Sequence, residues 1–88
     1  MSNANELLYI VADPSFWNRI SATRELTCGR VRFTNERVTL NMQEMSFPTK
    51  GHAVQHMVDG QILVRETRLS ENSWHYQLLL GHIDRKEY

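Results

Sequence analysis

The alternation of apolar and polar residues predicts two helices and five strands in the order β-α-β-β-α-β-β. The first apolar run, residues 7–12, is apolar on both faces of a strand and therefore predicts an interior strand of a sheet. Asp13 and Pro14 then begin a helix, because Asp accepts hydrogen bonds from first-turn amides and Pro needs no donor at the first position. This helix is expected to end between Ile20 and Leu26, and its apolar face consists of Phe16, Trp17 and Ile20.

Residues 29–42 predict a hairpin with its turn at Asn35-Glu36. In this register Phe33 lies opposite Val38, and every large residue on that face is apolar. A slip of one residue would invert both faces, so the pattern specifies this register. The other face is entirely polar and consists of Arg30, Arg32, Thr34, Arg37, Thr39 and Asn41.

A second helix is predicted between Thr49, which caps its start, and Gly60, which follows its end. Before it, Met45 and Phe47 resume the alternation out of phase, as at a bulge or a strand end. The apolar stripe of the helix consists of Ala53, Val54, Met57 and Val58.

The longest β-rich stretch, residues 61–83, predicts a closing hairpin with its turn at residues 70–73. The predicted pairs are Leu69 with Trp74, Thr67 with Tyr76, Arg65 with Leu78, and Leu63 with Leu80. The base of this hairpin is apolar on its second face too, through Ile62, Val64 and Leu79. Such a base needs two covering elements, so either a second molecule covers it or the strand order differs from the prediction.

The first six elements match the split β-α-β pattern of ferredoxin-like domains, an α+β architecture in which two helices cover one face of an antiparallel sheet. Eighty-eight residues are enough for one core. We therefore expect a disordered lead-in at residues 1–6, a single α+β domain at residues 7–83 and a charged tail at residues 84–88.

Charge and cysteine content narrow the class of protein. Ten basic residues balance ten acidic ones, so bulk charge favours neither nucleic acid nor a membrane as partner. Eight of the ten basic residues are arginine, whose planar group makes bidentate contacts with carboxylates and phosphates. Cys28 is the only cysteine, and no signal peptide or membrane-spanning run is evident. These features predict a cytoplasmic protein.

Candidate chemistry in the sequence is sparse. His52 and His56 have the i, i+4 spacing of a metal-binding pair, but the glutamate of His-Glu-x-x-His metalloproteases is absent, and a third ligand would have to come from His75, His82 or a carboxylate. Cys28 has no assignable base, and no glycine-rich phosphate loop exists. We therefore expect no cofactor and no enzymatic activity, with a metal site at the two histidines as a weak alternative.

The favoured hypothesis is a small non-enzymatic module that binds another protein or a second copy of itself, as an inhibitor or adaptor of the kind found in phages and mobile elements. Arginine, histidine and aliphatic residues on an open sheet face suit a partner-binding patch. The residues expected to form it are Arg30, Arg32, Arg37, Ile62, Val64, His75 and Leu79.

Nucleic-acid binding through Arg30, Arg32 and Arg37 is the alternative hypothesis. The order β-α-β-β-α-β also occurs in RNA-recognition motifs. The third-strand motif of that family, basic-Gly-aromatic-Gly-aromatic, is absent from this chain. Its neutral overall charge also counts against this alternative.

Overall fold

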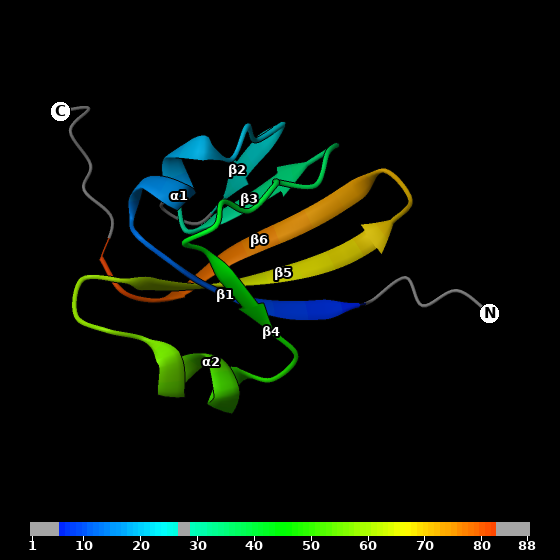
Figure 1. Cartoon of the computed structure of the whole chain (residues 1–88). Helices are drawn as coiled ribbons and strands as arrows, with labels where there is room; N and C mark the ends of the chain where they lie inside the picture. The colour runs from blue at the N-terminus through cyan, green and yellow to red at the C-terminus, as the bar shows by residue number, and fades with distance from the viewer. Residues whose placement is uncertain (1–5, 27–28, 83–88) are drawn as a thin grey trace, which may run out of the picture.

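The structure is a computed structural model that describes residues 6–26 and 29–82. Three parts of the sequence prediction lie outside the described residues. These are residues 1–5 of the lead-in, Cys28, and the charged tail at residues 84–88. The described residues form a six-stranded antiparallel sheet with two short helices (Figure 1), which confirms the α+β class. In chain order the elements are β1 (Leu7–Ala12), α1 (Ser15–Arg19), β2 (Arg24–Leu26), β3 (Val31–Thr34), β4 (Met45–Phe47), α2 (Lys50–His56), β5 (Ile62–Ser70) and β6 (Ser73–Leu80).

The strand order across the sheet is β2-β3-β6-β5-β1-β4. β1 lies between β5 and β4, which confirms the prediction of an interior strand from its two apolar faces. The short strands β2 and β4 form the two edges. The ferredoxin-like arrangement is not confirmed, because the middle hairpin and the placement of the helices both differ from it.

The middle hairpin was predicted wrongly, since residues 37–42 form no strand. β3 pairs with β6 on one side and with β2 on the other, so neither of its edges is left for that segment. β2 occupies residues where the end of the first helix was expected. The backbone of the 37–41 segment instead bonds to side chains. The Val38 amide donates to the Tyr76 hydroxyl at 2.9 Å, and the Arg19 guanidinium donates to the Thr39 carbonyl at 2.6 Å. Val38 and Leu40 still pack against the core.

The two strands of the closing hairpin were predicted correctly, but their register is mostly wrong by one residue. A two-residue turn joins Ser70 to Ser73, and an irregularity between Arg68 and Ser70 shifts the pairing. Tyr76 therefore lies opposite Glu66 instead of Thr67. A second irregularity near Leu63 restores the predicted pair of Leu63 with Leu80.

The two helices pack against opposite faces of the sheet, so the prediction that they share one face is wrong. α1 buries Phe16 and Trp17 against the face that includes Ile10, Ile62, Val64, Tyr76 and Leu78. α2 buries Ala53 against Val11 and Leu63, which point the other way. We call the side of the sheet that α1 covers the α1 face, and the opposite side the α2 face. The strands β1 and β5 are apolar on both sides, and one helix on each side covers them without a second molecule.

Candidate functional site

The seven residues predicted to form one open sheet face do not lie together. Ile62 and Val64 are fully buried under α1, so the prediction that they line a surface is wrong. The cause is the placement of the helices on opposite faces of the sheet, because α1 covers the face of β5 that includes Ile62 and Val64. His75 and Leu79 lie on the α2 face instead, where His75 neighbours Phe33.

Two of the three predicted arginines bond to the protein's own backbone. The Arg32 guanidinium donates to the carbonyls of Trp17 at 2.6 Å and Ile20 at 3.2 Å, and lies 4.9 Å from the centre of the Trp17 ring. It also pairs with Glu25. Arg30 donates to the Leu78 carbonyl at 3.3 Å. Arg32 thus fixes the carboxyl end of α1 to the sheet.

The third arginine, Arg37, belongs to a polar network under the 37–41 segment. Its Nε and Nη2 atoms lie 3.3 and 3.2 Å from the two carboxylate oxygens of Glu66, a side chain only 6% exposed. The Tyr76 hydroxyl donates to the same carboxylate at 2.7 Å. Burial raises the pKa of Tyr76 far above its ordinary value, so its hydroxyl stays protonated and remains a donor. The buried charge of Glu66 is therefore paired and hydrogen-bonded.

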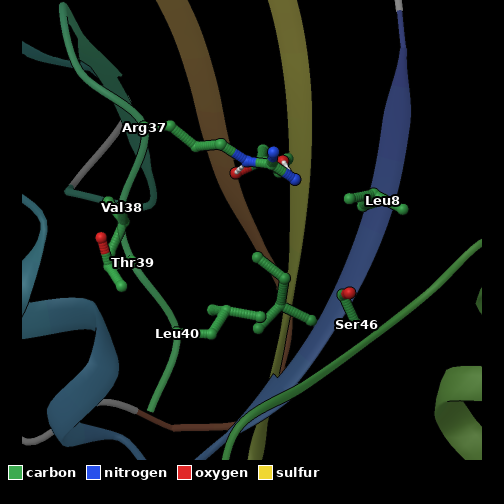
Figure 2. A pocket seen from close by; sticks show the side chains of 8 residues that line it. Leu8, Arg37, Val38, Thr39, Leu40 and Ser46 are labelled. Carbon is green, nitrogen blue, oxygen red and sulfur yellow. Dashed lines mark hydrogen bonds and ion pairs between the residues drawn. The ribbon is translucent and has the colours of Figure 1, made fainter.

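Two adjoining hollows lie along β1 on the α1 face, and we call them together the β1 groove. Both are bordered by Leu8, Arg37 and Glu66. The first, of about 290 Å³, has Leu8 and Ser46 on one side and the 37–40 segment on the other (Figure 2). The second, of about 340 Å³, is bordered by Arg68 and Trp74. Each is close to the lower limit of pockets that hold small ligands, and is large enough for a single bulky side chain.

The α2 face is left uncovered by helices over β2, β3 and β6, because α2 packs against β1, β4 and Leu63 of β5. Side chains on this part of the sheet form two cross-strand rows. In the first row the Arg24 guanidinium lies 4.5 Å from the Phe33 ring centre, which lies 4.9 Å from that of His75. In the second, Arg65 donates to Gln77 at 2.7 Å. We call this surface the open face; it consists of Arg24, Val31, Phe33, Arg65, His75 and Gln77.

Comparisons with known proteins assign no family to this chain. No family model, curated protein or solved structure matches it. The β1 groove and the open face are the two candidate sites that the described residues offer.

The histidine pair proposed as a weak metal site lies exposed on α2. The His56 ring stacks on Phe47 at 4.7 Å, and its Nδ1 atom lies 3.0 Å from the His52 carbonyl oxygen. Within residues 6–26 and 29–82 no three potential metal-binding side chains of His, Cys, Asp or Glu come together. None of the helices in these ranges is long and apolar enough to cross a membrane.

Sequence reasoning missed most of the residues of both surfaces. A signal for Glu66 exists: it is one of only two carboxylates in the strands, and it follows the apolar start of β5. The neighbours Phe33 and His75 come from β3 and β6, which are far apart in the chain. No local pattern indicates that these two strands pair.

Proposed function

We propose that the protein is a non-enzymatic protein-binding module, an inhibitor or adaptor, and that its partner docks in the β1 groove. The observation that carries this proposal is the pair of adjoining hollows, each lined by both apolar and charged side chains, with the exposed Arg37 at the border of both. Arginine and aromatic residues beside apolar pockets are the composition that dominates binding energy in protein interfaces. Leu8, Val38 and Leu40 supply the apolar wall, and Trp74 the aromatic group.

The partner chemistry that suits this groove is a bulky aliphatic or aromatic side chain next to a carboxylate. Arg37 uses Nε and Nη2 for Glu66, but its side chain is 56% exposed and has further donors. Arg68 donates through Nε to the Ser70 carbonyl, and its guanidinium lies 5.5 Å from the Trp74 ring centre. Both arginines can therefore receive a carboxylate at the rim while the apolar side chain enters the hollow.

The polar network supports a binding role over a catalytic one. Arg37 and Tyr76 bond to both oxygens of the Glu66 carboxylate, and the Val38 amide completes the link to the 37–41 segment. A general base needs a carboxylate that is available to a substrate proton. Here the carboxylate instead holds the wall of the groove against the sheet.

Site-specific photo-cross-linking tests the proposal. A photoreactive residue replaces Thr39, which is exposed and borders the first hollow, and in a control protein replaces the exposed Val54 on α2. We expect the probe at position 39, and not the one at position 54, to cross-link a protein from the native host, which mass spectrometry identifies. A product of twice the chain mass would identify the partner as a second copy.

Charge reversal at Arg68 then tests whether the rim of the β1 groove contacts the partner. Arg68→Glu should weaken capture of the identified partner at least about ten-fold, as expected for a hot-spot arginine. Lys50→Glu makes the same change of charge on α2 and should leave capture unchanged. Cross-links from position 54 alone, or equal capture by the two variants, would contradict binding in the β1 groove.

A further inference from the structure

Charges on the strands are distributed unequally between the two faces of the sheet. The strands contain two carboxylates, Glu25 and Glu66, and both lie on the α1 face, where they pair with Arg32 and Arg37. In the part of the chain that the structure describes, the strand side chains of the α2 face include Arg24 and Arg65 and no carboxylate. Within the described residues neither of these two arginines pairs with an acid, and the buried Arg65 Nε has no acceptor. The open face is therefore positively charged although the chain as a whole is neutral.

Planar groups lie side by side on this surface. Arg24, Phe33 and His75 are cross-strand neighbours on β2, β3 and β6, with the guanidinium and the two rings 4.5 and 4.9 Å apart in succession. Aromatic rings and guanidinium planes on a sheet surface are the groups on which unpaired bases stack. An arginine beside such a row can also contact the phosphate backbone.

We propose that the open face binds single-stranded nucleic acid. The cations Arg24 and Arg65 attract the phosphates, and the neighbouring Phe33 and His75 rings supply planes for the bases. A duplex fits less well, because its bases are read by elements that enter a groove and the open face is a sheet surface without a helix. An acidic protein segment would satisfy the cations but has no bases to stack on the rings. This activity is separate from the β1 groove, which lies on the opposite face.

Fluorescence anisotropy with labelled oligodeoxythymidylate and oligouridylate, measured over a series of salt concentrations, tests the proposal. Two phosphate contacts predict that the logarithm of the binding constant falls with the logarithm of salt concentration with a slope of about −1.4. Arg24→Gln should reduce this slope by about 0.7, because one contact is lost. Lys50→Gln removes the same charge from the exposed start of α2, outside the open face, and should leave both affinity and slope unchanged.

Stacking is tested separately from charge. Phe33→Leu keeps an apolar side chain at this half-buried position and should weaken binding about ten-fold while the salt slope stays the same. Polyglutamate at equal charge concentration should displace the oligonucleotide poorly. Three results would overturn the proposal: no binding at low salt, equal affinity of Arg24→Gln and wild type, or equal competition by polyglutamate. Arg24 is exposed, so its variant is expected to fold whatever the effect of Phe33→Leu.

Discussion

The two faces of the sheet use the same residue types in different ways. On the α1 face, Arg32 lies over Trp17 and bonds to two backbone carbonyls and to Glu25. On the α2 face, Arg24 lies over Phe33 and pairs with no carboxylate in the described part of the chain. Arg32 thus stabilises the fold, whereas the guanidinium of Arg24 is available to a partner. The difference depends on whether a carbonyl or carboxylate lies within reach.

This difference explains why the arginine pattern in the sequence did not indicate which arginines lie on the open face. Arg30, Arg32 and Arg37 share a polar pattern in the sequence, but each of them bonds to another part of the protein. Arg24 makes no side-chain hydrogen bond or ion pair with the described residues, and Arg65 makes one hydrogen bond, to Gln77. A guanidinium N–H that already bonds to the fold is not available to a partner.

The largest expected effect is the loss of stability when the aromatic ring under an arginine is replaced. This loss should differ between Trp17, under Arg32, and Phe33, under Arg24. Trp17 is fully buried, so Trp17→Ala should lower the free energy of unfolding by about 3–5 kcal/mol. Phe33→Leu, at a half-buried position, should lower it by less than about 1.5 kcal/mol. Urea denaturation measures both. Equal losses would show that the two faces are packed alike, against the structure.

The next largest effect is the difference in stability loss between substitutions of Arg32 and of Arg24. Arg32→Gln removes charged hydrogen bonds to Trp17, Ile20 and Glu25, and should cost about 1.5–3 kcal/mol of stability. Arg24→Gln, at an exposed edge, should change stability by less than about 0.5 kcal/mol. The same denaturation experiment compares them. If Arg24→Gln lowered the free energy of unfolding as much as Arg32→Gln, Arg24 would also be a structural residue and would not be available to a partner.

A third, somewhat smaller effect tests the network beneath the β1 groove. Tyr76→Phe removes a donor to Glu66 and the acceptor of the Val38 amide, and should cost about 1–3 kcal/mol. Tyr9→Phe is the matched control on the α2 face, because the Tyr9 hydroxyl makes no hydrogen bond to the described residues, and it should be nearly neutral. An unchanged Tm for Tyr76→Phe would show that the network does not hold the 37–41 segment in place.

The smallest expected effect is a pH dependence that belongs to the open face. Burial, and then the nearby Arg65 charge, lower the pKa of His75 below its ordinary value of 6.5. The unfolded chain therefore binds a proton at a higher pH than the folded chain, so stability should decrease as pH falls below about 6.5. His75→Gln should remove this part of the pH dependence, whereas His52→Gln, on exposed α2, should keep it. Thermal melts at several pH values measure the difference, and equal profiles for wild type and His75→Gln would contradict the assignment.

Local patterns predicted much of the secondary structure but little of the arrangement between elements. The two-sided apolar run of β1, the capped helix at Thr49 and both strands of the closing hairpin were predictable, because their signals lie within a few neighbouring residues. The register was not, because the irregularity between Arg68 and Ser70 shifts the pairs from Arg68 to Val64 by one residue. Residues 37–41 alternate like a strand but cover the core with Val38 and Leu40. Both candidate surfaces depend on these non-local outcomes, so the sequence predicted an arginine-bearing open face but assigned it the wrong arginines.

The central distinction between the faces is that the Nε–H groups of Arg32 and Arg37 are bonded internally, whereas the Arg24 side chain makes no hydrogen bond to the described residues. Solution NMR of the arginine Nε–H groups measures this for each side chain. Arg32 and Arg37 donate from Nε to Glu25 and Glu66, so their signals should exchange slowly with water and show little motion. The Arg24 signal should exchange fast and show large motion. Equal exchange and motion at Arg24 and Arg32 would contradict the account.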